Sequence, residues 1–162
     1  MSIEMARAYF RSLGIEDRIL EFEESSATVE LAAQVLNVSP ARISKTLSFK
    51  TDNGCMLIVC AGDARVDNRK FKDLFSFKAK MLSPEETGEM VGHDIGGVCP
   101  FGIKDGIPVY LDESMLRFDT VFPAAGGSNS AIEMTIDELF KYSHAKGWVD
   151  VCKVPEDAAA GV

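Results

Sequence analysis

The 162-residue sequence has no apolar run near the ~20 residues that a membrane span needs, and its first residues lack the apolar stretch of a signal peptide. It has only two histidines, and its four cysteines form no CxxC pair and match no zinc-binding spacing. Neither GxGxxG nor GxxxxGK[ST] occurs. These absences argue against a membrane protein, a disulfide scaffold, a zinc domain and a P-loop or dinucleotide-binding fold. We expect a cytoplasmic protein with buried, reduced cysteines.

The composition is that of an ordinary globular domain, with 46% hydrophobic and 26% charged residues. No linker, internal repeat or low-complexity segment divides the sequence, and a chain of this length fits one domain. We therefore expect a single domain over residues 1–153. The short segment 154–162 should form a flexible C-terminal tail.

Capping residues and apolar spacing predict the helices, and alternation or apolar runs predict the strands. The expected helices cover residues 2–13, 28–36, 68–74, 83–92 and 135–144. The expected strands cover residues 18–22, 45–51, 55–61, 77–82, 109–111, 120–124, 131–134 and 148–152. The run 55–61 is apolar throughout, which is typical of a strand at the centre of a sheet. Hairpins mixed with helices indicate an α+β fold with a mixed sheet.

Lys45 begins a predicted strand in which side chains alternate between two faces. It shares its face with Leu47 and Phe49, whereas Thr46 and Ser48 belong to the polar face. A lysine at the start of an apolar face either extends its ammonium group to solvent or points it toward the mouth of a pocket. Alternation alone leaves both interpretations open.

Two glycine pairs, Gly96-Gly97 and Gly126-Gly127, lie in predicted loops. Because glycine tolerates positive φ and exposes its backbone, such pairs can present N–H donors to a carbonyl oxygen or an oxyanion. Ordinary turns also explain a glycine pair, so the pattern by itself does not define a site.

Cys99 lies in the first glycine loop, and His93 is the nearest candidate base in the sequence. A nucleophilic cysteine needs a lowered pKa and usually a base. One hypothesis for the function is therefore a thiol hydrolase built on these two residues. The alternative is that Cys99 is a buried, reduced thiol.

The formal net charge is −8, whereas a protein that binds nucleic acids through nonspecific phosphate attraction is usually basic. Basic residues nevertheless concentrate in residues 61–80, where Arg65, Arg69, Lys70 and Lys72 are candidates for contact with a nucleic acid. One basic patch on an acidic body allows such a partner to dock locally. A solvated helix face explains the same charges.

Five short segments carry information through their order and spacing. They are residues 28–33 (TVELAA), 43–47 (ISKTL), 62–67 (GDARVD), 96–102 (GGVCPFG) and 125–127 (AGG). Together they resemble the YbaK/ProX family of aminoacyl-tRNA deacylases, whose members stand alone or form the editing insertion of bacterial prolyl-tRNA synthetases. The resemblance extends over most of the chain.

The resemblance implies an α+β fold with a mixed, curled, barrel-like β-sheet and flanking helices. It also implies hydrolysis of the ester between a wrong amino acid and its tRNA, with no metal or other cofactor. Lys45 is similar to the family's lysine, and residues 96–100 are similar to its GxxxP loop. The implied catalytic groups are Lys45 and the backbone amides of Gly96 and Gly97. The implied substrate-binding residues are Thr46, Val98, Pro100, Gly126, Gly127 and Ser128.

An aminoacyl ester is already activated, so attack by water requires positioning and charge stabilisation more than a strong nucleophile. This explains why no catalytic triad is visible. The implied partners are the acceptor end of an aminoacyl-tRNA, docked on the basic segment, and an aminoacyl-tRNA synthetase, with no membrane. Some members carry a histidine in the later glycine loop, whereas residues 126–130 read GGSNS. The alternative function is a catalytically inactive module that binds tRNA or a synthetase.

Overall fold

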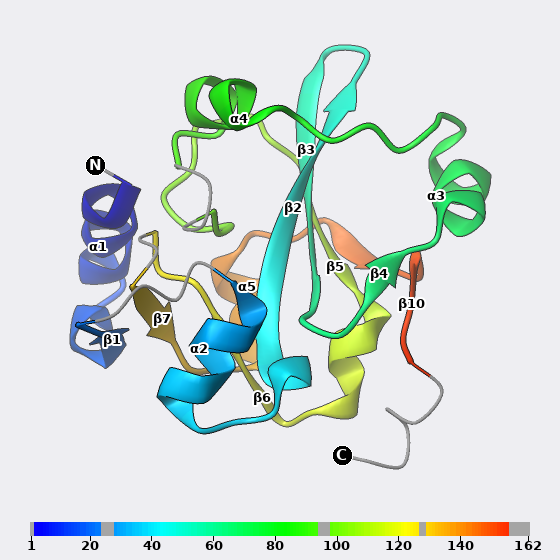
Figure 1. The fold of residues 1–162 in the computed structure, drawn as a ribbon. Coiled ribbons are helices and arrows are strands. Elements are labelled where there is room, and N and C mark those ends of the chain that lie inside the picture. The colour runs from blue at the N-terminus through cyan, green and yellow to red at the C-terminus, as the bar shows by residue number, and fades with distance from the viewer. Residues whose placement is uncertain (1, 24–27, 94–97, 127–128, 156–162) are drawn as a thin grey trace.

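A long antiparallel hairpin, formed by β2 (Ile43–Thr51) and β3 (Gly54–Ala61), is the centre of the structure (Figure 1). The computed structural model describes residues 2–23, 28–93, 98–126 and 129–155. Every residue of β3 after Gly54 is buried, as its uninterrupted apolar sequence predicts.

Four further strands extend the hairpin into a six-stranded sheet with the order β8-β6-β2-β3-β5-β9. Their bounds are β5 Val109–Asp112, β6 Thr120–Pro123, β8 Met134–Thr135 and β9 Gly147–Val149. β6 runs parallel to β2, β5 to β3 and β9 to β5, whereas β8 is antiparallel to β6. The sheet is therefore mixed, and it curls into a half-barrel (Figure 1). The predicted α+β fold with a mixed, curled sheet is confirmed.

Two short antiparallel ribbons lie outside this sheet. In the first, β1 (Ile19–Glu21) pairs with β7 (Ser130–Ile132). In the second, β4 (Arg65–Val66) pairs with β10 (Cys152–Lys153), which brings the C-terminal part of the chain beside the predicted basic segment.

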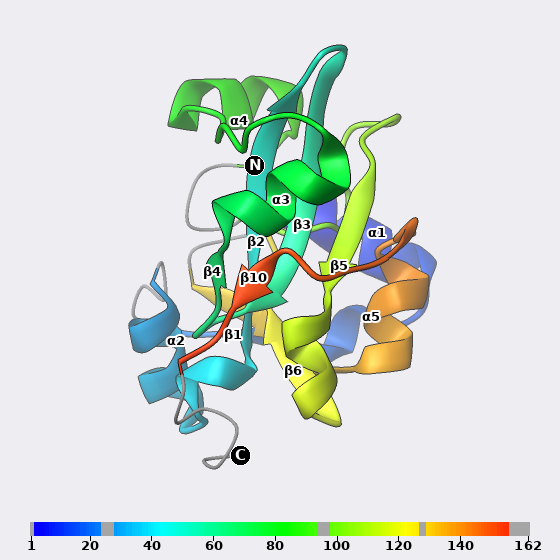
Figure 2. The same cartoon turned by 90° about the vertical axis from the view of Figure 1, so that its right-hand side faces the viewer.

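Helices flank the sheet, and α2 and α5 lie on opposite sides of it (Figure 2). The α-helices of the described ranges are α1 Ser2–Ser12, α2 Val29–Leu36, α3 Asn68–Phe75, α4 Pro84–Met90 and α5 Ile136–Tyr142. Short 3-10 helices are η1 Glu16–Arg18, η2 Pro40–Arg42 and η3 Glu113–Arg117. Side-chain caps start α2 to α5 where the sequence predicts them, at Thr28, Asp67, Ser83 and Thr135.

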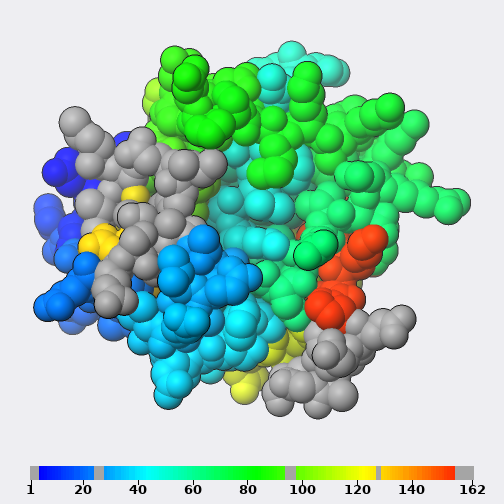
Figure 3. Space-filling model, viewed as in Figure 1, coloured from blue at the N-terminus to red at the C-terminus, as the bar shows by residue number. Residues whose placement is uncertain are grey.

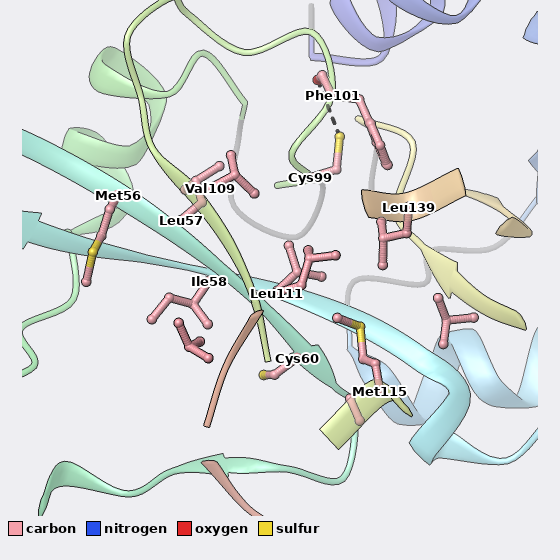
Figure 4. Close-up of a cluster of buried hydrophobic side chains, with 14 of the residues drawn as sticks. Met56, Leu57, Ile58, Cys60, Cys99, Phe101, Val109, Leu111, Met115 and Leu139 are labelled. Atoms are coloured by element: carbon pink, nitrogen blue, oxygen red, sulfur yellow. Dashed lines mark hydrogen bonds between the residues drawn. The ribbon is translucent and has the colours of Figure 1, made fainter. Parts of the chain in front are cut away.

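The core fills the space between the hairpin and the segments that pack on it from the C-terminal half (Figure 4). Leu57 and Ile58 of β3 and Leu111 of β5 have no exposed surface. From α1, the ring of Phe10 packs against Phe101, with ring centroids 4.9 Å apart. This aromatic contact ties the N-terminal helix to the loop that carries the predicted GxxxP motif.

Two predicted strands differ from the structure. Residues 77–82 form no strand, because only Met81 bridges to β2 before the chain turns into α4. The predicted strand 148–152 divides between β9 and β10. The division occurs because the chain leaves the main sheet near Val151, whose N–H donates to the Asp112 carboxylate (2.9 Å).

None of the helices in the described ranges is long and apolar enough to span a membrane. Of the predicted C-terminal tail, residues 156–162 lie outside the described residues.

Candidate active site

One edge of β2 has partners at both ends and a gap in the middle. β6 pairs with only the first two residues of β2. Farther along, the Lys50 N–H donates to the Lys80 carbonyl (2.8 Å), and the Leu82 N–H donates to the Ser48 carbonyl (3.0 Å). Among the described residues, no strand pairs with this edge between the two contacts. A pocket of about 240 Å³ occupies the gap.

Thr46 lies in the middle of this gap. In a strand, the N–H and C=O groups of one residue point to the same edge, and the next residue points them to the opposite edge. Because Ser48 and Lys50 direct backbone groups toward the 80–82 segment, Thr46 directs its own N–H and C=O toward the same edge. The pocket therefore has one main-chain donor and one main-chain acceptor at its floor.

The walls of the pocket come from segments that are distant in the sequence. α2 and α4 contribute residues from either side, β6 and β7 contribute residues from the C-terminal half, and Val98 belongs to the loop of the predicted GxxxP motif. In Figure 3 the recess lies between α4 above and α2 below, with the cyan atoms of the hairpin at its floor. The fold thus brings Val98 to the same pocket as Lys45 and Thr46, although β3, β4, α3 and α4 lie between them along the chain.

The Lys45 side chain is half-buried and lines this pocket. Its Nζ donates to the Gly62 carbonyl, 3.5 Å away, in the turn after β3. An ammonium group has three N–H donors, so this contact leaves donors for an anionic or carbonyl oxygen in the pocket.

The other implied binding residues are placed differently. Pro100 and Gly126 are buried, and neither belongs to the pocket lining in the described residues. Gly126 has φ +97°, in the region that favours glycine. The implied residues Gly96, Gly97, Gly127 and Ser128 lie outside the described residues.

Cys99 and His93 are neighbours, but they form part of the core (Figure 4 shows Cys99). Both are fully buried, and the Cys99 Sγ lies 3.6 Å from His93 Nε2. Burial raises the pKa of the Cys99 thiol to about 12, which keeps it protonated and unreactive. The His93 Nε2 lies 2.6 Å from the Phe101 carbonyl, which can only accept, so this nitrogen carries a proton and cannot act as a base. The geometry does not favour the thiol-hydrolase hypothesis.

The predicted basic residues lie on β4 and α3, on the side of the hairpin away from α1 (Figure 1). Arg65, Arg69 and Lys72 are exposed. Lys70 is different, because its Nζ donates to the Asp150 carboxylate and to the Cys152 carbonyl, each at 3.0 Å. Lys70 therefore ties α3 to the C-terminal segment.

The described lining of the pocket contains one cation, several hydroxyl groups and backbone donors, with no carboxylate, imidazole or thiol. Across the described ranges, no three His, Cys, Asp or Glu side chains come together in a way that would hold a metal ion. The chemistry that this lining offers is hydrogen bonding to an oxygen-rich ligand by fixed donors.

Residues 23–142 match the family model of the aminoacyl-tRNA editing domain. The chain belongs to the aminoacyl-tRNA editing domain family. The match includes α2, the hairpin and Val98, which together form most of the pocket. It confirms the resemblance that the five sequence segments carry.

Relatives of the editing domain include proteins of its own length and segments of longer ones. The uncharacterized protein YwhH of Bacillus subtilis (strain 168) is 53% identical over 154 residues, which are 94% of this chain and 98% of YwhH. The proline–tRNA ligase of Bacillus licheniformis is 29% identical over 133 residues, which are 79% of this chain and only 23% of the ligase. The crystal structure of a candidate trans-editing enzyme for prolyl-tRNA synthetase has a TM-score of 0.84 at 29% identity, covering 94% of this chain and 97% of that chain.

Of the described pocket lining, sequence reasoning identified Lys45, Thr46 and Val98 and missed the rest, including the hydroxyl-bearing residues Ser48 and Thr87. Alternation assigned Ser48 to the polar face of the strand, but α4 covers it and only 5% of it is exposed. The one sequence feature near these residues was the capping box of α4. It predicts where that helix starts, but it does not predict which strand residues the helix covers.

Proposed function

We propose that this editing domain is a trans-acting deacylase, which hydrolyses the ester bond between an incorrect amino acid and its tRNA without a metal ion. The observation that supports this best is the pocket at the free edge of β2. There Lys45 and the Thr46 backbone lie together in a space of about 240 Å³. That volume is below the roughly 300–1,000 Å³ of sites for drug-sized ligands, and suits a single small aminoacyl group.

In the proposed reaction, a water molecule attacks the carbonyl carbon of the ester, and the bond from that carbon to the ribose oxygen breaks. One proton of the water passes to the ribose oxygen, which leaves as a hydroxyl group, and the other is released to solvent, so that the amino acid leaves as a carboxylate. Negative charge develops on the carbonyl oxygen in between, and N–H donors fixed in place stabilise it. The Thr46 N–H is one such donor, and the Gly96 and Gly97 amides are the others that we propose.

Lys45 supplies positive charge beside the reacting ester. Because its ammonium group already contacts the Gly62 carbonyl, its position is restrained before substrate binds. We propose that it binds the terminal phosphate or the carbonyl region of the substrate, so that binding energy holds the ester in a reactive position.

The remaining contacts follow from the resemblance. Val98 already lines the pocket and would contact the aminoacyl group. Pro100 would hold the loop in shape, and the later loop with Gly126, Gly127 and Ser128 would contact the terminal nucleotide.

The proposed partner is the acceptor end of a mischarged tRNA, with a synthetase as the source of that tRNA. The exposed cations Arg65, Arg69 and Lys72 would position tRNA phosphates without reading the base sequence. Lys70 would contribute less, because Asp150 already pairs with it.

The direct test is hydrolysis of a panel of mischarged tRNAs by the purified protein, with the metal chelator EDTA present in a parallel series. We expect release of the wrong amino acid from at least one tRNA, at the same rate with and without the chelator. Binding of the tRNAs without hydrolysis of any of them would instead show an inactive binding module. A loss of activity in EDTA would contradict the metal-free mechanism.

A further inference from the structure

Two hydroxyl groups form a buried pair at the end of the pocket beyond Thr46. Ser48 of β2 and Thr87 of α4 both line the pocket, and their side-chain oxygens are 3.2 Å apart. Only 5% of Ser48 and 3% of Thr87 is exposed. Apolar Leu47 and Leu82 lie next to them in the lining, so the pair is a polar spot in apolar surroundings.

The directions of the hydrogen bonds that Ser48 and Thr87 make follow from the single proton that each hydroxyl group carries. The Thr87 Oγ1 lies 2.9 Å from the Ser83 carbonyl, which can only accept, so the single hydroxyl proton of Thr87 goes there. Thr87 can then only accept from Ser48, which uses the single hydroxyl proton of Ser48. Toward the pocket, the Ser48 oxygen therefore acts as a hydrogen-bond acceptor.

We propose that Ser48 is a specificity-determining residue, which accepts a hydrogen bond from the hydroxyl group of a seryl or threonyl side chain. The inference rests on the proposed deacylase function and names the amino acids that it removes. Thr87 acts through Ser48, because it holds the Ser48 proton away from the pocket.

The spacing along β2 supports this assignment. Ser48 follows Lys45 by three residues, which is about 10 Å in an extended strand. With Lys45 at the phosphate or carbonyl end of the substrate and the Thr46 backbone in the middle, the side chain of the amino acid points toward Ser48. Residues along the same edge of β2 would thus contact both the ester end and the side-chain end of the aminoacyl group.

An alanyl side chain has no donor for Ser48. It would displace water from the pocket and leave a buried acceptor without a hydrogen bond, which carries a desolvation cost. A single neutral hydrogen bond corresponds to roughly a three- to tenfold preference. We expect that preference for seryl over alanyl esters in kcat/KM.

The experiment uses one proline-accepting tRNA charged with serine or with alanine, and the full chain as wild type, Ser48→Ala and Ser143→Ala. Ser48→Ala should lose the preference for serine, because the seryl ester loses its hydrogen-bond acceptor and the alanyl ester no longer leaves that acceptor unpaired. Ser143→Ala is the matched control, because Ser143 is a buried serine outside the described pocket lining, and its hydroxyl donates to the Phe140 carbonyl. Its preference should stay at the wild-type value.

Hydrolysis of the alanyl ester also shows whether each variant is folded. If Ser48→Ala is inactive on both esters, the double variant Ser48→Ala with Thr87→Val removes both partners and leaves no hydroxyl unpaired. Retention of the serine preference in either variant would overturn the assignment, as would a wild type that hydrolyses both esters equally. Those results would leave the deacylase function intact, whereas a wild type inactive on all mischarged tRNAs would contradict both proposals.

Discussion

The ammonium group of Lys45 lies 3.5 Å from the carbonyl oxygen of Gly62, at a position with no room for a side chain. A Cβ atom on Gly62 would collide with the Pro40 carbonyl and would lie 2.7 Å from Val29 Cγ1. The turn after β3 is therefore pressed against the start of η2 and against α2. The position of the Lys45 ammonium group and the shape of the pocket wall thus depend on the same close packing around Gly62.

Replacement of Lys45 by alanine should abolish most deacylation and leave the fold intact. The reason is that the pocket loses its one cation, and loss of one fixed donor to a developing oxyanion typically lowers kcat by about 10²–10³. The measurement is the single-turnover rate on a mischarged tRNA. Lys50→Ala is the matched control, because Lys50 lies on the same strand and pairs with Glu86 outside the pocket. Near wild-type turnover by Lys45→Ala would remove Lys45 from the mechanism.

Replacement of Gly62 by alanine should lower both stability and activity. Overpacking of a tight contact costs roughly 1–3 kcal/mol, and relief of the clash would move the carbonyl that restrains Lys45. Urea unfolding and the deacylation rate measure the two effects. Gly147→Ala provides the control, since no atom lies within 4 Å of a Cβ at that position. If Gly147→Ala lowered stability and activity as much as Gly62→Ala, the close packing of Gly62 would not be the cause of the losses.

The double substitution Arg69→Ala with Lys72→Ala should weaken tRNA binding and flatten its salt dependence. Each lost phosphate contact should reduce the slope of log K against log salt concentration by roughly 0.7–0.9. Lys141→Ala with Lys146→Ala removes two exposed charges near α5, away from α3, and should leave the slope unchanged. Hydrolysis of a minimal aminoacyl ester should be the same for all three proteins. An equal loss on tRNA and on the minimal ester would mean that the basic residues support the fold.

Glu138 should make stability depend on pH in the acidic range. The Arg18 guanidinium binds both oxygens of the Glu138 carboxylate, at 2.8 and 3.0 Å, and holds its pKa at about 2, below the ordinary value of 4.5. A lowered pKa contributes stability above about pH 4.5 that is lost as the pH falls toward 2. Glu138→Gln keeps the capping box but loses the charge, so it should be less stable than wild type by about 1 kcal/mol or less at pH 7. In thermal unfolding, a difference that stays constant down to pH 2 would contradict this assignment.

Local signals predicted most of the fold correctly. Thr28, Asp67, Ser83 and Thr135 start helices because each satisfies backbone N–H groups of the first turn, an effect that depends only on adjacent residues. The hairpin was also predictable, because its turn and its apolar second strand are contiguous in the sequence. The family motifs then indicated Lys45 as a site residue.

The pocket itself was not predictable from the pattern along the chain. It exists because β6 pairs with β2 only as far as Ser44 and the 80–82 segment pairs with it only from Ser48 onward, and both segments come from elsewhere in the sequence. The same long-range packing buries Ser48, although alternation assigned it to the polar face of the strand. Residues 77–82 were predicted as a strand for a related reason, since their composition fits one but only the short stretch 80–82 pairs with β2.

A strand edge without a partner is a template on which another chain can pair its own strand, and proteins that expose such edges tend to aggregate. In this domain the free stretch of β2 is short and lies at the floor of a recess between α2 and α4. The two flanking helices restrict the approach of a strand from a neighbouring molecule to this edge. Loss of the contact with residues 80–82 would therefore lengthen the unpaired stretch of β2 and expose it to intermolecular β-pairing.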